Sequence, residues 1–418
     1  MTPLVNAGRR GRGWWFPLGA LVLGTVPQAA HAEQWVLENS LATRYESNDN
    51  TALVHNSAGT MNTLSLSSAL AASRKTENSA TRLNALVSSV RQWGPGEQDR
   101  VDGRLGLEQT LADPLNSFRL GTQYLQDFNS TVDSADVTVA RGRRRTKTLS
   151  GAWSRSLSER VSAELETTLD RTAYGMPPPQ AVDFRNDSLS AGISYRWAEL
   201  TSVNLNASHS KYRTEADTSR STTDQISLGF SHAWSERNSL SLSLGSYRTR
   251  TAGLRSRLVC PLAPSFCDAG FVQPVVSFER AYTSGRGLQF NLSQRYQLDE
   301  RTDLAFSAAR QQAPSGAGVV VRSDTLRASA SHSFSDLLKA SASYSQSRST
   351  YESLEGSSLR PAQQSFSLSF SRQLAADLSV QAGYQFSRAD GVAPGQGARA
   401  NSVSVSLQYD WPRFDAAR

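Results

Sequence analysis

Acid–base or nucleophilic chemistry in this chain would have to rely on very few histidines. The sequence contains five of them: His31, His55, His209, His232 and His332. Hydrolases and transferases need a nucleophile or an activated water, with a histidine as the usual base. No two of these histidines are spaced to form a recognisable catalytic or metal site. We therefore expect a protein that is not an enzyme and that uses no metal or cofactor.

The other side chains that could contact a solute are small polar residues at alternate positions. Ser341, Ser343 and Ser345 form one such stripe, and similar runs of Ser, Asn and Gln recur along the chain. Hydroxyl and amide groups exchange hydrogen bonds with a hydroxylated solute at little net cost. Five arginines fall on the same polar positions: Arg82, Arg104, Arg119, Arg295 and Arg327. Acids are fewer there (Glu108, Glu164 and Glu166), so the sequence predicts a mildly positive polar surface.

The strongest charge cluster is the run "ARGRRRTK". Its cations are Arg141, Arg143, Arg144, Arg145 and Lys147. Arginine and lysine bind phosphate groups through charge-assisted hydrogen bonds. We expect this run at an outer loop or strand top, either in contact with lipopolysaccharide phosphates or an acidic polymer, or simply solvated.

The elements that must position these residues are two-faced strands. In "SVSVSLQYDW", residues 402 to 411, every second residue is apolar and the others are polar. Alternation with a period of two places one face against an apolar medium and the other against water. Further stripes of this kind recur along the chain, and none shows a helical period. This order argues against intrinsic disorder.

The N-terminus has the features of a targeting signal. Three arginines precede the apolar stretch Trp14 to Val26, and "AHA" ends at Ala32. This pattern predicts a secretory signal peptide over residues 1–32 and a mature chain over residues 33–418. Removing the signal's arginines lowers the net charge from +7 to +4, which gives no case for nucleic-acid binding. Hydrophobic residues make up only 38% of the chain, too few for a large soluble core.

Export through an oxidising compartment also decides the state of the two cysteines. Cys260 and Cys267 are close in the sequence, and exported chains form disulfides. We expect one local disulfide between them. No histidine lies near enough to favour a metal site instead.

Short acidic turns divide the strands into pairs. They occur around Glu77, Asp113, Glu159, Glu199, Glu236, Glu300, Asp336 and Asp377. Longer loops rich in Gly, Pro, Asp and Arg fall midway between them. Short turns at one end and long polar loops at the other are typical of a transmembrane, antiparallel, up-and-down β-barrel of the outer membrane. The sequence predicts an all-β fold of about 18 strands, with 16 and 20 left open. A parallel β-helix would repeat at a shorter period.

One interval between turns is unusually long and contains the cysteines. Its central segment, residues 249–286, is either one long loop or an additional hairpin. The sequence leaves both open.

The end of the chain has the features of a closing strand. The apolar face of residues 402–411 includes the aromatic residues Tyr409 and Trp411, which we expect in an interfacial girdle, and Phe414 follows. This ending resembles the C-terminal signal that the barrel-assembly machinery reads, except that "DAAR" follows the last aromatic residue. We expect this strand to pair with the segment from Trp35 to Tyr45.

A short motif carries a family resemblance. The stretch "YESNDN", Tyr45 to Asn50, resembles the Tyr-x-Asp-Asn-type opening of an outer-membrane β-barrel porin family associated with exopolysaccharide and exosortase (PEP-CTERM) loci. Asn48 is an extra residue relative to that pattern. The resemblance implies an outer-membrane barrel that accompanies exopolysaccharide secretion, and it supplies no catalytic residues.

These observations leave three expected functions. The first is a pore or accessory conduit for an exported polysaccharide, and the second is a closed structural barrel that acts through loops or partners. The third is a general diffusion porin, which should have a long constriction loop folded inward, and the sequence shows no clear one. Expected partners are outer-membrane lipid and lipopolysaccharide, the barrel-assembly machinery, an exported polysaccharide and periplasmic export components.

Overall fold

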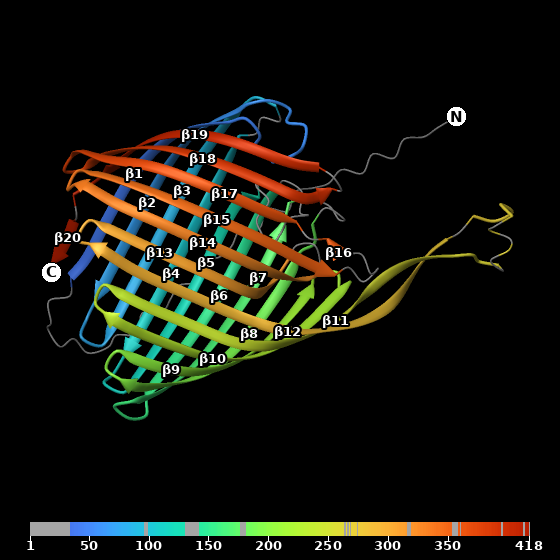
Figure 1. Ribbon diagram of the computed structural model, residues 1–418, viewed down its shortest axis with the longest axis horizontal. Helices are drawn as coiled ribbons and strands as arrows, with labels where there is room; N and C mark the ends of the chain where they lie inside the picture. Colours follow the sequence, from blue (N-terminus) through green and yellow to red (C-terminus); the bar gives the residue numbers. More distant parts are fainter. Residues whose placement is uncertain are drawn as a thin grey trace. The chain divides into compact units, whose positions relative to one another are not determined.

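The computed structural model is built almost entirely from antiparallel strands (Figure 1). It describes residues 34–95, 99–129, 142–175, 181–262, 265, 267, 269–273, 275–315, 319–352, 358–359, 361–393, 396–412 and 414–417. The predicted signal peptide and Arg141 lie outside these residues. By contacts, the chain divides into Met1–Ala32 and Glu33–Arg418, and the barrel belongs to the second unit.

Eighteen strands form the wall of the barrel. Their bounds are β1 (Gln34–Asn48), β2 (Met61–Lys75), β3 (Ser79–Trp93), β4 (Arg100–Ala112), β5 (Asn116–Asn129), β6 (Gly142–Ser156), β7 (Val161–Tyr174), β8 (Phe184–Ala198), β9 (Thr201–Thr214), β10 (Ser219–Ser235), β11 (Asn238–Val259), β12 (Val275–Asp299), β13 (Thr302–Pro314), β14 (Val320–Ser335), β15 (Leu338–Glu352), β17 (Ala362–Ala375), β18 (Leu378–Ala393) and β19 (Gln396–Asp410). Two short strands are additional, β16 (Ser358–Leu359) beside β15 and β20 (Phe414–Ala417) beside β1. The predicted count of 18 is confirmed.

The barrel closes where its first and last wall strands pair. Residues Ser40 to Asn48 of β1 lie opposite Asp410 to Ser402 of β19 in an antiparallel ladder. Closure gives every wall strand two neighbours, so no backbone edge is left unpaired in the bilayer. The pairing expected for the last strand is therefore confirmed.

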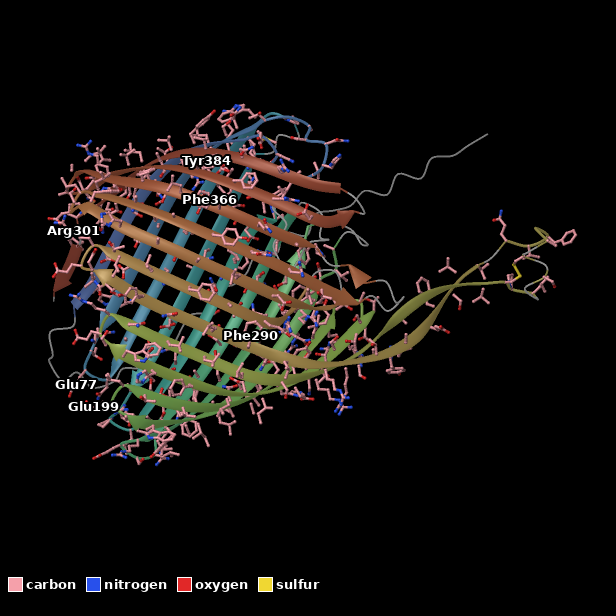
Figure 2. The ribbon with its side chains drawn as sticks, viewed as in Figure 1. Glu77, Glu199, Phe290, Arg301, Phe366 and Tyr384 are labelled. Carbon is pink, nitrogen blue, oxygen red and sulfur yellow. A yellow bond between two sulfur atoms is a disulfide. The ribbon has the colours of Figure 1, made fainter. Side chains whose placement is uncertain are left out.

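All eight predicted acidic turns are the short connections at one end of the barrel. Figure 2 shows Glu77, Glu199 and Arg301 at this end, which we call the turn end. The chain reverses tightly there; Asp113, for example, accepts hydrogen bonds from the backbone N–H groups of Leu115 (2.8 Å) and Asn116 (2.7 Å). These bonds lower the pKa of Asp113 below its usual value, so the turn keeps a charged acceptor. The other end of the barrel is the loop end.

Contacts across the lumen identify the inner face of the wall. Tyr212 on β9 donates a hydrogen bond of 2.8 Å to the backbone oxygen of Ser315, between β13 and β14. Only a side chain that points into the barrel can reach strands that are not its neighbours. Successive residues point to opposite faces, and register shifts in the described strands occur only near the ends of six ladders. This contact therefore fixes the faces of the wall residues between those shifts.

The outer face is an apolar band. Outward positions include Leu205, Leu228, Leu244, Phe366 and Val405, all of which are exposed in the isolated chain. Figure 2 shows the rings of Phe290, Phe366 and Tyr384 along the wall. Outward aromatic residues cluster near the turn end, among them Tyr195, Trp197, Trp234 and Trp411. A closed barrel with an apolar outer band and an aromatic girdle is an outer-membrane β-barrel, and the outer membrane of a Gram-negative bacterium is its location. No helix among the described residues is long and apolar enough to cross a membrane.

The long interval in the sequence is neither a loop nor an additional hairpin. Instead β11 and β12 lengthen to 22 and 25 residues and stay paired from Asn238–Tyr296 to Val259–Val275. The ladder between β10 and β11 ends at Gly253, so the remaining residues of β11 pair only with β12. They form a two-stranded ribbon that projects well beyond the barrel rim (Figure 1).

A disulfide joins Cys260 and Cys267 at the tip of this ribbon, with Cα atoms 5.9 Å apart. An isolated two-stranded ribbon is only marginally stable in water, so a covalent link at its tip adds local stability. Replacing both cysteines with serine should destabilise the ribbon by roughly 2–3 kcal/mol at most. We expect faster proteolytic cleavage within the ribbon, measured on intact cells, and unchanged heat-modifiable migration of the barrel. Loss of the folded barrel band would contradict this local role.

Candidate functional site: the lumen and its constriction

The inner face of the wall is lined by small hydroxyl groups that bond to one another. Ser341 and Ser369 lie on neighbouring strands with hydroxyl oxygens 2.7 Å apart, and Ser343–Ser367 (2.6 Å) and Ser345–Ser365 (2.7 Å) continue the ladder. Direct opposition in the register brings these short side chains together. The side chains on this part of the wall are therefore short, uncharged and hydrated, and they leave the adjacent lumen unobstructed.

All five arginines expected on the polar positions lie on the inner face and are exposed there. Arg82, Arg104 and Arg119 are on the adjacent strands β3, β4 and β5, whereas Arg295 and Arg327 lie on β12 and β14. Arg82 is directly opposite Glu108, and Arg295 forms an ion pair with Asp303 (3.3 Å). The structure therefore brings three of the arginines into one sector of the wall and separates the other two from them.

Several further charges lie on the same face and were not predicted from the sequence. They form pairs between alternate residues or across a ladder: Arg44–Glu46 (2.9 Å), Arg100–Asp102 (3.0 Å) and Arg144–Asp127 (2.7 Å). The same period-two pattern that located Arg82 could have found them. Because these pairs are internally neutralised, they leave the field of the lumen weak.

Three of the acids of the lumen lie on one strand. Glu164, Glu166 and Asp170 are all inward positions of β7. Arg119 on β5 and Glu166 on β7 share a cross-strand row with Ala152 between them. In the sector from β3 to β7, the acids of β7 therefore lie beside a wall in which cations and acids are already interleaved.

The lumen narrows at the loop end. Inward side chains that are buried occur in that half of the barrel and form a belt around it: Thr172, Tyr174, Phe184, Tyr212, Thr214, Tyr247, Thr249, Val321 and Ser349. At the turn end the inner face borders open space, including a cavity of 620 Å³ beside Arg196, Ser241 and Arg295 and another of 530 Å³ beside Glu38 and Arg104. The lumen is widest toward the turns and narrowest at the belt.

The main cause of the narrowing is the hairpin between β13 and β14. We call residues 311–315 and 319–321 the inward tip. The ladder between β12 and β13 ends at Phe290–Arg310, so the tip is released from β12 and contacts the inner face of β9 and β11. In addition to the Tyr212–Ser315 bond, Thr249 donates a hydrogen bond to Gln312. Val320 packs against the cluster of Tyr174, Ala181, Phe184 and Tyr212.

The loop between β1 and β2 adds a second inward contact. Leu53 is buried against the inward residues Ala389, Ala398 and Ala400, and its backbone is in the left-handed region with φ of 50°. Asn50 holds the loop by donating hydrogen bonds to the backbone oxygens of Val54 (2.7 Å) and Arg399 (2.9 Å). The sequence shows no clear inward-folded loop, but the structure contains these two inward contacts. The inward tip and this loop have the polar, Gly-containing composition of any surface loop, so their composition could not reveal the contacts.

A third cavity lies directly beside the inward tip. It has a volume of 280 Å³ and is lined by Glu166, Ser188, Gln225 and Gln312 among others. A solute that passes the belt would meet hydroxyl and amide groups together with one acid from the β7 line. This arrangement can select by size and by hydrogen bonding, and it contains no nucleophile–base pair.

None of the four histidines in the described part of the chain contacts another. His232 and His332 lie on the outer face near the turn end, where they contact Thr201 (2.9 Å) and Thr302 (2.8 Å). His209 is also outward and pairs with Asp224 (2.7 Å), while His55 contacts the backbone oxygen of Gly397. No group of three potential metal ligands occurs among the described residues.

The basic run divides between the two faces. Arg143, Arg145 and Lys147 are exposed outward positions at the top of β6, whereas Arg144 points inward to Asp127.

The C-terminal aromatics Tyr409 and Trp411 are neighbours on the outer face, with ring centroids 5.1 Å apart. Phe414 lies opposite Leu37 in the short ladder between β20 and β1.

Comparisons with known proteins identify the fold and not the family. No protein-family model matches the chain, and no curated protein matches its sequence. OccAB4 of Acinetobacter baumannii superposes with a TM-score of 0.50 at 10% identity, over 93% of this chain and 100% of that one. OccK9 (OpdG) of Pseudomonas aeruginosa gives 0.49 at 12% identity, over 91% and 98% of the two chains. The ferric-catecholate import receptor Fiu of E. coli K12 gives 0.46 at 10% identity, over 89% and 81%. At these identities the likeness to OccAB4 supports the barrel fold alone.

Proposed function

We propose that this barrel is a passive pore for small hydrophilic solutes, with a size limit set by the belt at the loop end. The observation that supports this most directly is the inward tip, which is held against the inner face of β9 and β11 by hydrogen bonds to Tyr212 and Thr249. A structural barrel has no need for a hydrated lumen with a built constriction. A wide conduit for a long polymer is hindered by one.

The charge distribution supports a weak preference for anions. Arg104, Arg119 and Arg327 are exposed inward cations without an ion-pair partner among the described residues, whereas Arg295 is paired. The acids of β7 partly offset them, so the net field is small. A weak field attracts an anion without trapping it, as passage requires.

We expect purified protein in planar bilayers to conduct with slight anion selectivity that declines as salt increases, because screening shortens the reach of the charges. Replacing Arg82, Arg104, Arg119, Arg295 and Arg327 with glutamine should abolish or reverse that selectivity. A matched control replaces five exposed outward arginines: Arg248, Arg250, Arg286, Arg348 and Arg388. The control should leave selectivity unchanged.

The same recordings test the other two expected functions. Absence of conductance under all conditions would favour the closed structural barrel. The association with exopolysaccharide secretion rests on the motif from Tyr45 to Asn50 and stays a prediction. Uptake measurements with short neutral oligosaccharides and with long polysaccharides separate polysaccharide export from diffusion of small solutes. A pore with a size limit should admit the oligosaccharides and exclude the polysaccharides.

A further inference from the structure

Five consecutive strands place a cation at the same cross-strand row of the outer face. In the ladders, Lys147 on β6 lies opposite Arg171 on β7, and Arg171 lies opposite Arg185 on β8. Arg185 is in turn opposite Arg213 on β9, which is opposite Arg220 on β10. We call these residues the cation row. Like charges directly opposite each other on a sheet are destabilising, so such a row calls for a compensating anion.

Acidic residues of the chain neutralise only two of the five cations in this row. Arg185 pairs with Asp187 (2.7 Å) and Arg220 pairs with Asp217. Lys147, Arg171 and Arg213 are exposed and have no ion-pair partner in the described part of the chain. The wall from β13 to β15 differs, because there Arg310, Asp324 and Arg348 follow one another in a row of alternating sign. Opposed cations also occur at Arg248–Arg286 and at Arg388–Arg399, but the wall from β6 to β10 differs in carrying a cation at the same row of five successive strands.

The height of the row matches a lipid headgroup region. Lys147 and Arg171 are each one outward position above an apolar residue, Leu149 and Leu169, toward the loop end. Arg213 and Arg220 lie three outward positions above Ala207 and Ile226. The row thus begins at the edge of the apolar band and rises away from it. In an outer-membrane barrel the longer loops are extracellular, so the row faces the outer leaflet.

We propose that the cation row binds the phosphate groups of lipopolysaccharide. The rising row suits a glycolipid that carries phosphate both at the hydrocarbon boundary and further out in its sugar core. Arginine presents its donors in a planar fork that matches phosphate oxygens, and four of the five cations are arginines. Hydrocarbon chains of the same lipid would then lie against Leu149, Leu169 and Leu189 below. The inference depends on the outer-membrane location and not on pore activity.

The test is retention of lipopolysaccharide by the folded barrel. Native protein and the triple variant Lys147→Gln, Arg171→Gln and Arg213→Gln are extracted from outer membranes, exchanged into detergent and analysed by native mass spectrometry. We expect the triple variant to retain severalfold less lipopolysaccharide than the native protein. The control variant Arg286→Gln, Arg348→Gln and Arg388→Gln removes equal charge from the outer face at the loop end of β12, β15 and β18. It should retain the native amount.

Added lipids separate the sources of binding. Native protein stripped of lipid should rebind phosphorylated lipid A and should not rebind dephosphorylated lipid A. Equal binding of both would show that hydrocarbon contact is responsible, and equal loss in the control would show a general effect of charge; either result overturns the proposal. Should the triple variant not fold, as judged by heat-modifiable migration, Arg171→Gln alone should weaken retention and Arg171→Lys should restore part of it. Native retention by Arg171→Gln would then refute the site.

Discussion

Replacing Leu242 with arginine should destabilise the folded barrel by about 2–4 kcal/mol, the cost of a cation near the bilayer midplane. Leu242 lies in the middle of the barrel-forming part of β11, opposite Phe230 and Leu292, and all three face lipid. An arginine there has no acid and no water within reach. The expected loss is measured by urea titration of the barrel refolded in liposomes, with heat-modifiable migration as the readout.

The neighbouring residue provides the control. Ser241 faces the lumen between Ser231 and Ser293, where an arginine side chain can stay hydrated. We expect Ser241→Arg to fold with nearly native stability. Equal damage from the two substitutions, or none from either, would mean that the faces of β11 are assigned the wrong way or that this strand does not border lipid.

Removing the inward tip should increase single-channel conductance severalfold. Gln312 and Arg322 are directly opposite each other in the ladder, so replacing residues 313–321 with Asn-Gly closes the hairpin with a two-residue turn. The variant removes the backbone that Tyr212 binds and the Val320 contact with the aromatic cluster. We expect larger neutral solutes to enter liposomes that contain the shortened protein. Unchanged conductance and size limit would place the constriction elsewhere.

A deletion outside the lumen controls for loop shortening as such. Gly253 and Ala281 are opposite each other at the base of the projecting ribbon, and joining them by the same turn removes a longer segment. That variant should conduct as the native protein does. A milder substitution, Tyr212→Phe, removes only the hydroxyl bond to Ser315, worth about 1 kcal/mol. It should make the open channel noisier without enlarging it.

Local pattern was sufficient to predict the wall of this barrel. Alternation along residues 402–411, with its apolar residues at odd positions, determines which face of β19 meets lipid, because side chains on a strand alternate whatever surrounds them. The acidic turns, such as those at Glu199 and Glu300, divide the chain at intervals that fit pairs of neighbouring strands. These two short-range signals predicted about 18 strands with 16 and 20 left open, the pairing of the last strand with the first, and the placement of Arg82 and Ser241 on the polar face.

Contacts between residues distant in sequence were decided by the tertiary structure. The bond from Tyr212 to Ser315 joins residues 103 positions apart, and nothing in the composition of the inward tip distinguishes it from a solvated loop. The extended pairing of β11 and β12 likewise depends on how the two strands align with each other, and the sequence of one strand taken alone does not determine it. The cation row is the clearest case: Lys147, Arg171 and Arg213 are unremarkable in their own strands. They become one site because the registers of four successive ladders place them side by side, and a register is set by all the pairs in a ladder at once.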